Sequence, residues 1–334
     1  MIKNNIFTIK QLKNVVFIGE HESLKNLIRI NDKFKIKSLV ITSPIQKKKF
    51  DKNLKYKTFN KLNKSFMNYV SKKVEINNSL FISIKSRWIF KKSMIKKFFQ
   101  GNLINYHPAR LPYYRGGATS SWRIMNGDKI DCQLFHIVSE KVDEGPILYF
   151  EKSIVPKNCK TPLDFEKYSS IQIVKLYENF IKILKVKKKI ILSKQPSYIS
   201  HYFPRLNSKI NGWIDWSINS SNLSRFIDSF DDPYQGAITM YKSKKVFIKG
   251  AYLHGGEISK HNYMSGMVSR HDGEWITVCT SDENSILITE VINDKGKNII
   301  KSIKPGERFY TPASEIVKSR SYRAKYGPRG LSKY

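Results

Sequence analysis

The sequence predicts an α/β fold with a mostly parallel sheet in its N-terminal domain and a smaller β-rich domain after it. In the first 150 residues, short apolar runs alternate with polar helical stretches, a pattern typical of a parallel sheet. After Gln195-Pro196 the composition shifts to glycine, tryptophan and short alternating strands. The length of 334 residues exceeds that of one ordinary domain, which favours two.

Short apolar runs mark the strands of the N-terminal domain in chain order. The first run follows polar residues and leads into a helix at Leu24–Ile30, for which Ser23 is a suitable N-cap. A basic helical stretch is expected at Ile95–Phe99. The predicted strands are Val15–Gly19, Leu39–Thr42, Leu80–Ile84, Leu103–Tyr106, Leu134–Val138 and Ile147–Phe150. The sheet is Rossmann-like, but the first turn holds only the lone Gly19, so NAD is not implied.

A long helical pattern from Thr161 to Lys189 closes the N-terminal domain. Its predicted apolar face consists of Leu163, Phe165, Ile171, Ile173, Val174, Leu176, Phe180, Ile183 and Leu184. The later strands are predicted at Val246–Ile248, Trp275–Val278 and Ile286–Val291. We therefore divide the chain into an α/β domain with its linker helix (1–200), a β-rich domain (201–312) and a basic, mobile tail (313–334).

Composition excludes several classes of protein. Hydrophobic residues make up 40% of the chain, which is enough for a core and excludes general disorder. No stretch is long and apolar enough for a membrane span, and the N-terminus lacks a secretory signal pattern. The cysteines Cys132, Cys159 and Cys279 form no CxxC pair. A reducing, cytoplasmic location is the expectation.

The formal net charge of +33 invites a nucleic-acid interpretation. The excess is mostly lysine, however, whereas recognition of phosphates and bases relies on arginine. The lysines are spread along the chain, with local concentrations at Lys47–Lys49 and from Lys318 to Tyr334. We interpret both concentrations as solvated surface. A basic surface would still favour any phosphorylated substrate.

The most informative segment is NYHPARLPYYRGG, residues 105–117, at the end of a predicted strand. Open α/β sheets place their ligand crevice at this edge. Residues two apart on a strand share a face, so Asn105 and His107 can project together. Pro108 and Pro112 stiffen the loop that follows. A further carboxylate, Asp143, precedes a Gly-Pro turn and the next predicted strand.

An amide, an imidazole and a carboxylate suit acyl transfer to an amine without a covalent enzyme intermediate. Asn105 can donate to the oxygen that becomes anionic in a tetrahedral intermediate. His107 can carry protons near neutral pH, and Asp143 can orient it and favour its charged form. The other histidines, including His21 and His136, are interpreted as structural. No HxH or HxxxH pair supports a metal site.

These motifs together resemble the folate-dependent formyltransferases. The resemblance rests on Asn105-x-His107-Pro108, Leu111-Pro112-x-Tyr114-Arg115-Gly116, Trp122 with Asn126-Gly127, and Asp143-x-Gly145-Pro146. It covers residues 15–155 well and continues more weakly through FPRL at 203–206, WIDW at 213–216 and FDDPYQGA at 230–237. The later segments are similar to the linker and small β-rich barrel of the family's longer members. Within them, Trp213 and Trp216 are interpreted as core residues at the domain junction.

The resemblance implies a one-carbon transferase that uses 10-formyltetrahydrofolate as co-substrate and no metal. It also implies the catalytic residues: Asn105 holds the formyl oxygen as it becomes an oxyanion, His107 manages the amine proton, and Asp143 fixes and polarises His107. Leu111–Pro112 is by the same resemblance a candidate cis peptide. The cofactor-binding residues carried over from the family are Ser86, Arg87, Trp88, Ala109, Arg110, Leu111, Pro112, Glu140 and Val142.

The motifs indicate the acceptor amine less clearly than the formyl donor, and two hypotheses for the acceptor stay open. Arg115-Gly116-Gly117 with Trp122 and Asn126-Gly127 resembles the branch that formylates UDP-4-amino-arabinose, although that branch has a further basic residue where Gly117 stands. This favours a nucleotide-linked amino sugar. Two-domain length and high charge suit methionyl-tRNA formyltransferase, whose affinity for tRNA would depend on phosphate contacts.

Against the tRNA reading, only Lys47–Lys57 stands where that enzyme inserts a long basic loop, and GGATSS replaces the usual GAAP. Another small amine also stays open. A third class, a basic binding protein with an inactive formyltransferase fold, is disfavoured by the intact Asn105, His107 and Asp143. We expect the C-terminal domain to help hold the acceptor or a second protomer of a homodimer.

Overall fold

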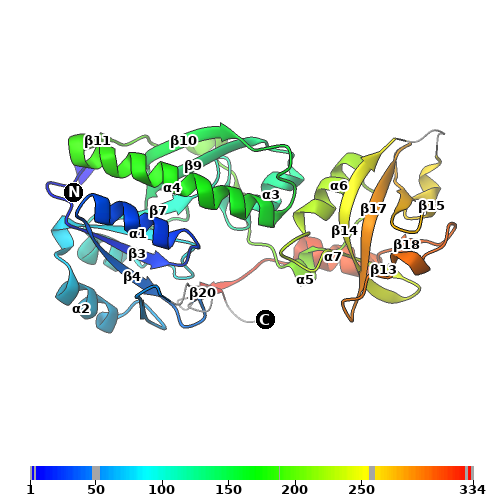
Figure 1. The fold of residues 1–334 in the computed structure, drawn as a ribbon, viewed down its shortest axis with the longest axis horizontal. Coiled ribbons are helices and arrows are strands. Elements are labelled where there is room, and N and C mark those ends of the chain that lie inside the picture. The colour runs from blue at the N-terminus through cyan, green and yellow to red at the C-terminus, as the bar shows by residue number, and fades with distance from the viewer. Residues whose placement is uncertain are drawn as a thin grey trace.

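The computed structural model describes residues 2–3, 5–46, 53–187, 189–255, 260–327 and 330–331. The molecule is elongated, with an α/β domain at its N-terminal end and a β-rich domain beside it along the long axis (Figure 1). This is the architecture that the sequence predicts. The basic run Lys47–Lys49 lies outside the described residues.

A seven-stranded sheet in the order β10-β9-β7-β6-β3-β4-β5 forms the centre of the N-terminal domain. The five strands from β7 to β5 run parallel to their neighbours. The two strands at the other edge, β9 and β10, are antiparallel. The bounds are β3 Asn14–Gly19, β4 Lys37–Thr42, β5 Lys57–Thr58, β6 Ser79–Ile84, β7 Leu103–His107, β9 Ile130–Ile137 and β10 Ile147–Ile154.

The sheet is mostly parallel, as the sequence predicts, and its antiparallel part is confined to one edge. Only residues 138–146 connect β9 to β10, and they contain no helix. A parallel pair needs a longer crossover, usually a helix, whereas a short loop returns the chain beside the strand it has just left. The sheet is therefore parallel at its centre, where apolar runs alternate with helices, and antiparallel where the intervening helix is absent.

Helices cover both faces of this sheet (Figure 1). On one face, α1 (Leu24–Lys33) and α4 (Pro162–Lys187) share a core with β3, β6 and β7. On the other, α2 (Lys64–Lys73) and a π-helical turn (Met94–Phe98) form a second core. Ile171, predicted on the buried face of α4, is instead 69% exposed. Ser23 precedes α1 as predicted, but its hydroxyl donates to the Ser170 carbonyl (2.7 Å) and caps nothing.

Alternation along β7 separates its side chains between the two faces. Ile104 and Tyr106 belong to the core beneath α1 and α4. Successive residues of a strand point to opposite faces, so Asn105 and His107 lie on the other side. The Tyr106 hydroxyl donates to the Gln133 side chain and lies 3.4 Å from the carbonyl oxygen of Ser169 on α4. These contacts hold β7 from the face that α1 and α4 cover.

The C-terminal domain is an antiparallel six-stranded sheet in the order β15-β16-β17-β14-β13-β18. Helix α6 (Ser220–Ser229) contributes Leu223 and Ile227 to its core. Trp213 and Trp216 are buried, which confirms their interpretation as core residues, and Trp216 stacks on Phe309 at 5.8 Å. The bounds are β13 Ala237–Tyr241, β14 Lys244–His254, β15 Val268–His271, β16 Ile276–Cys279, β17 Ser285–Asn293 and β18 Phe309–Tyr310.

The remaining elements are short and mostly lie at edges and in the linker. Helices α3 (Thr119–Met125) and α5 (Ser208–Asn211) flank the junction of the domains. Strand β8 (Arg115–Gly116) pairs in parallel with β12 (Tyr202–Phe203). The others are β1 Ile2–Lys3, β2 Ile6–Thr8, β11 Lys189–Ile191, β19 Tyr326–Gly327, β20 Gly330–Leu331 and 3-10 turns at Ile76–Asn78, Ser197–Ile199, Asn262–Met264 and Ile300–Ser302.

The predicted mobility of the tail is wrong for its first part, because Ala313–Ser321 forms helix α7. Asn211 of α5 donates its side-chain amide to the Ser319 carbonyl at 2.7 Å. Arg320 forms an ion pair with Asp215. These contacts come from segments about 100 residues away in the sequence, so local composition could not indicate them. The start of the tail is thus part of the C-terminal domain.

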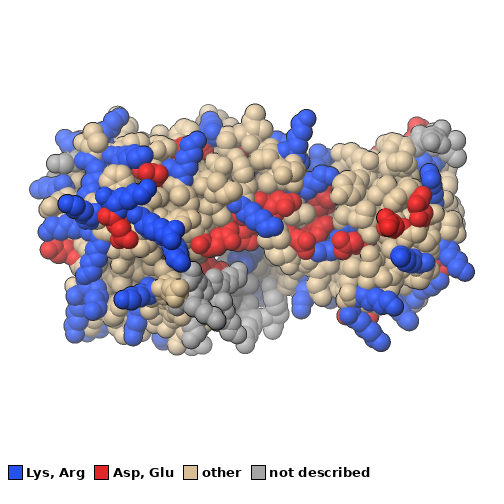
Figure 2. Space-filling view, viewed as in Figure 1, with Lys and Arg blue, Asp and Glu red and all other residues tan. Residues whose placement is uncertain are grey.

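Two properties of the described residues bear on the class of protein. No helix among them is long and apolar enough to cross a membrane. Lysine and arginine are dispersed over both domains on the face in Figure 2, while several acidic side chains lie together across the junction on that face. The high charge is therefore not gathered into one basic surface on this face.

Candidate active site

Asn105, His107 and Asp143, which the sequence analysis selects as catalytic, lie close together at the carboxyl end of β7. His107 Nδ1 lies 3.8 Å from Asp143 Oδ2, an ion-pair contact rather than a hydrogen bond. Asn105 connects to the same carboxylate through His136, which lies between them. A strand that ends at a sheet edge and a returning loop thus bring together side chains that are 38 residues apart.

The His107 ring is buried and is anchored at Nε2. Its Nε2 donates to the carbonyl of Tyr114 at 2.6 Å, a bond within the loop that follows β7. Because that bond places a proton on Nε2, Nδ1 is the nitrogen that faces Asp143. The ring can therefore exchange a proton at Nδ1 without giving up its anchor at Tyr114.

The backbone of Asp143 lies in the left-handed region, with φ at 54°. Gln195 stabilises this turn, because its side-chain amide donates to the carbonyls of Asp143 (2.8 Å) and Gly145 (2.6 Å). The Gly116 N–H donates to Asp143 Oδ2 at 2.9 Å. Gly145 is required by close approach, since a Cβ there would lie 1.7 Å from the Ile137 carbonyl oxygen. The carboxylate is thus placed by three separate segments of the chain.

His136 is a member of this cluster that the sequence analysis assigned to the structural histidines. Its Nε2 lies 3.2 Å from Asn105 Nδ2 and 3.3 Å from Asp143 Oδ1. The antiparallel register places it directly opposite Asn105. The one signal in the sequence is a histidine inside an otherwise apolar strand, LFHIV. The sequence does not show that β9 pairs with β7, so it does not indicate that this histidine lies beside Asn105.

Burial and neighbouring groups shift the pKa values of both His107 and Asp143. Burial lowers the pKa of His107, and the Asp143 carboxylate partly opposes this effect. Burial by itself would raise the pKa of Asp143, but its interactions with His107, with His136 and with the Gly116 N–H together lower it below the ordinary range. At neutral pH the site therefore holds a carboxylate beside an imidazole that is mostly neutral and able to accept a proton.

We expect His136→Phe to reduce kcat about tenfold, which corresponds to about 1.4 kcal/mol or one lost hydrogen bond. Phenylalanine keeps a ring in this buried position but removes the nitrogen that orients Asn105 and Asp143. The matched control is His21→Phe, another buried histidine, which lies outside the cluster. Steady-state kinetics on both variants checks this. Equal losses of kcat would show that the effect is one of folding.

The segments expected to bind the cofactor lie beside the cluster. After β6, the Ser86 hydroxyl accepts from the Trp88 N–H at 3.2 Å, Arg87 is half-buried, and Trp88 is buried in the core beneath α2. After β9, Glu140 forms ion pairs with Lys92 (2.9 Å) and Lys96 (3.6 Å), while Val142 is exposed. These ion pairs hold the two loops next to each other, as the prediction of a shared pocket requires.

The loop after His107 is anchored through its own residues. Ala109 and Leu111 are buried, and the Leu111–Pro112 peptide is cis, as the resemblance suggested. Arg110 forms an ion pair with Asp128 at 2.9 Å and lies over the Tyr113 ring at 5.2 Å. These two contacts of Arg110 therefore hold its loop in place.

The interdomain linker covers this loop. Strand β12 pairs with β8, and the Phe203 ring stacks on Tyr114 at 5.2 Å. Trp122 donates its indole N–H to the Pro204 carbonyl at 2.8 Å. Gly116 has φ at 103°, and a Cβ there would lie 2.1 Å from the Phe203 carbonyl oxygen. The glycines after Arg115 thus allow the linker to pack closely over the loop that follows His107.

Comparison with known families matches two successive parts of the chain. Residues 14–164 match the family described as "Formyl transferase". Residues 207–304 match "Formyl transferase, C-terminal domain". The two matches correspond to the α/β domain with its cluster and to the β-rich domain.

A curated relative and two solved structures match over most of the chain. The methionyl-tRNA formyltransferase of Thermodesulfovibrio yellowstonii is 26% identical over 303 residues, or 86% of this chain and 92% of that protein. An N-formyltransferase from Helicobacter canadensis, solved with folinic acid and dTDP-3-aminofucose, has a TM-score of 0.61 at 21% identity and covers 84% of this chain and 99% of its own.

The second structure is a sugar 3N-formyl transferase solved with dTDP and 5-N-formyl-THF. It has a TM-score of 0.63 at 19% identity and covers 84% of this chain and 98% of its own. At these identities both structures show a shared fold.

Proposed function

Because the chain belongs to the formyltransferase family, a family of one-carbon group transferases, we propose that it transfers a formyl group from 10-formyltetrahydrofolate to the amine of a nucleotide-linked amino sugar. The observation that carries the formyl-transfer step is the convergence of Asn105, His107, His136 and Asp143 at the carboxyl edge of the sheet. An amide donor, a proton acceptor and a carboxylate are the groups that direct acyl transfer to an amine requires.

Asn105 holds the formyl oxygen. Its side-chain amide has two N–H donors, and one is directed to His136. The second remains for the oxygen that gains negative charge when the amine attacks. A donor that is already oriented stabilises this charge without reorganisation during the reaction.

His107 takes the proton that the amine loses. Its free nitrogen is Nδ1, which faces the Asp143 carboxylate. A proton that arrives there forms an imidazolium beside an anion and opposite the Tyr114 carbonyl, which keeps the ring in place. Asp143 thereby offsets the cost of a buried positive charge.

One of the predicted cofactor-binding residues, Trp88, lines a cavity whose side chains suit a folate. A cavity of about 270 Å³ is lined by Lys61, Leu62, Asn63, Trp88, Ile89, Lys91 and Met94. Its apolar members suit a ring system, and its two lysines suit the carboxylates of a glutamate tail. The folate would supply the activated formyl carbon. In this assignment the loops at residues 86–88 and 140–142 border the ring.

For the acceptor, we favour a small molecule over tRNA. The linker closes over the loop after His107, and Gly117 is packed against Arg205, so the approach to the cluster is narrow on that side. The tRNA alternative is supported by the relative from Thermodesulfovibrio, which is similar along nearly its whole length.

The experiment that separates these acceptors is formyl transfer from 10-formyltetrahydrofolate to two pools, amino-sugar nucleotides and charged initiator tRNA. Asn105→Ala serves as the blank. We expect transfer to a sugar nucleotide. Transfer to the tRNA alone would overturn the acceptor assignment and leave the formyl-transfer step intact, whereas no transfer to any amine would contradict both.

A further inference from the structure

A cavity of about 480 Å³ lies where the two domains meet. Its walls come from the turn between α3 and β9, the loop before α4, helix α6 and strand β14. This volume is in the range of about 300–1,000 Å³ that holds drug-sized ligands. Both domains supply side chains, so the cavity exists only in the two-domain chain.

The cavity lies on the other side of β7 from the catalytic cluster. Phe165 of α4 lines it, as does Arg123, whose guanidinium lies over the Phe165 ring at 5.0 Å. This is the face toward which Tyr106 points, opposite to Asn105 and His107.

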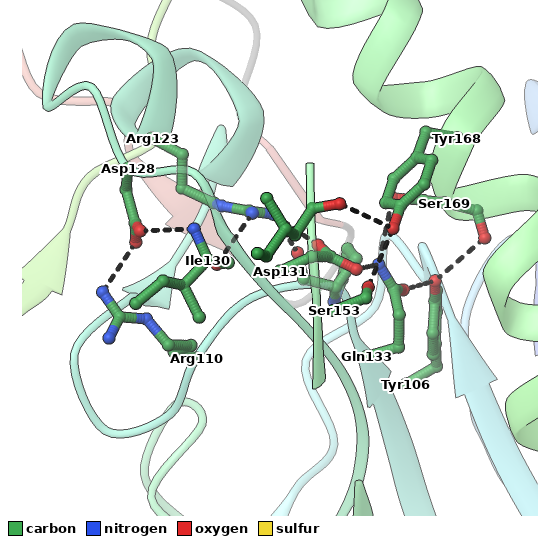
Figure 3. A network of polar contacts seen from close by, with 12 residues as sticks. Tyr106, Arg110, Arg123, Asp128, Ile130, Asp131, Gln133, Ser153, Tyr168 and Ser169 are labelled. Carbon is green, nitrogen blue, oxygen red and sulfur yellow. Dashed lines mark hydrogen bonds and ion pairs between the residues drawn. The ribbon is translucent and has the colours of Figure 1, made fainter. Parts of the chain in front are cut away.

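The Arg123 guanidinium already binds several groups of the protein. Figure 3 shows it within the polar network that includes Asp131, at 2.9 Å, and Gln133. Its Nη1 also donates to the Pro108 carbonyl at 3.2 Å, directly after His107. The cations that remain to bind a ligand are therefore the lysines and the other arginine of the cavity lining.

Those cations have no acidic partner among the described residues. Lys129, Lys157, Lys160 and Arg225 all line the cavity. In the part of the chain that the structure describes, none of the four forms an ion pair, although Lys160 lies over the Tyr252 ring at 4.0 Å and Arg225 donates to Asn222. Four unpaired cations around one cavity provide a strong attraction for an anion with several negative oxygens.

Asp228 is the one unpaired carboxylate among the described residues of the lining. The other, Asp128, is paired with Arg110. Burial raises the pKa of Asp228 to about 7, against the opposing effect of Lys160 and Lys129 and with added repulsion from Asp231 and Asp164. Arg225 lies on the same helix, and Asp128 faces the cavity from the α3–β9 turn. Near neutral pH this carboxyl group can therefore be protonated and donate a hydrogen bond.

We propose that this junction cavity is a second ligand site, separate from the catalytic cluster, that binds a nucleoside phosphate. The phosphate oxygens lie among Lys129, Lys157 and Lys160, the protonated Asp228 donates to one of them, and Tyr252 borders the rest of the ligand. The site does not depend on which amine receives the formyl group.

Calorimetric titration of the full chain with UDP and with inorganic pyrophosphate tests this site. We expect both to bind the wild type, and Lys157→Ala/Lys160→Ala to weaken binding at least tenfold while the acceptor KM is unchanged. The matched control is Lys175→Ala/Lys185→Ala, two exposed lysines on α4 that do not line the cavity. Asn105→Ala, which removes transfer, is expected to bind pyrophosphate like the wild type.

The pH dependence gives a second, independent readout. At pH 8, about one unit above the pKa of Asp228, the wild type must take up a proton on binding, which weakens its affinity about tenfold relative to Asp228→Asn. This difference disappears at pH 6, and the comparison cancels the titration of the ligand itself. The site is overturned if neither probe binds, if Asp228→Asn shows no advantage at pH 8, or if the lysine variant raises the acceptor KM in proportion, since the cavity would then hold the acceptor.

Discussion

Asn105→Ala is expected to lower kcat for formyl transfer about 10²–10³-fold while folate still binds, because this is the usual loss when one oriented oxyanion donor is removed. The strand that carries Asn105 is held by its neighbours β6 and β9, so the fold is retained. Single-turnover transfer and folate titration on the same preparation measure the two effects separately.

The control for this experiment is Asn102→Ala. Asn102 is also a buried asparagine, and it lies just before the other end of β7, where its amide contacts the Ile76 carbonyl at 3.5 Å. Its loss is expected to reduce stability without a large effect on kcat. A transfer rate near that of the wild type in Asn105→Ala would refute the oxyanion assignment.

Asp143→Asn is expected to lower kcat about 10²-fold or more, within the range attributed to a positioned acid–base group. Asparagine tolerates the left-handed backbone that residue 143 adopts, so the turn persists. The loss arises because the imidazolium of His107 no longer has an anion beside it.

This variant also changes the pH profile in a defined direction. The Asp143 carboxylate raises the pKa of His107 against the lowering effect of burial. Removal of the carboxylate lowers that pKa further, so the acidic limb of the kcat profile, where His107 becomes protonated, moves to lower pH. Asp282→Asn, a change at another hydrogen-bonded aspartate in the C-terminal domain, serves as the control. An unmoved limb in Asp143→Asn would contradict the pairing with His107.

The parallel strands could be predicted from sequence because each is buried on both faces and reads as a continuous apolar run. Val15–Gly19 and Leu80–Ile84 are predicted to within one residue of β3 and β6. The direction of β9 could not be predicted in the same way, since pairing is set by contacts between distant segments. His136 was missed for this reason: its role follows from its register with Asn105.

The structure of the C-terminal region could also be predicted only in part from its sequence. Short β-rich patterns indicated its strands, but β14 extends well beyond the apolar run that marked it, and β17 extends slightly beyond its own. Their outer halves carry exposed or polar residues and are kept in the sheet by ladder hydrogen bonds with one another. Helix α7 was not predicted because its stability comes from contacts with α5 and Asp215 rather than from an apolar face.

The pairing of β12 with β8 has a consequence for how such chains can be recombined. The segment that joins the domains packs against the proposed active site, because Gln195 supports the Asp143 turn and Phe203 stacks on Tyr114. A chimaera in which a foreign C-terminal domain begins directly after residue 164 would lose the segment that contains Gln195 and Phe203. We therefore expect the smallest exchangeable N-terminal unit to reach at least to Arg205, which packs against Gly117.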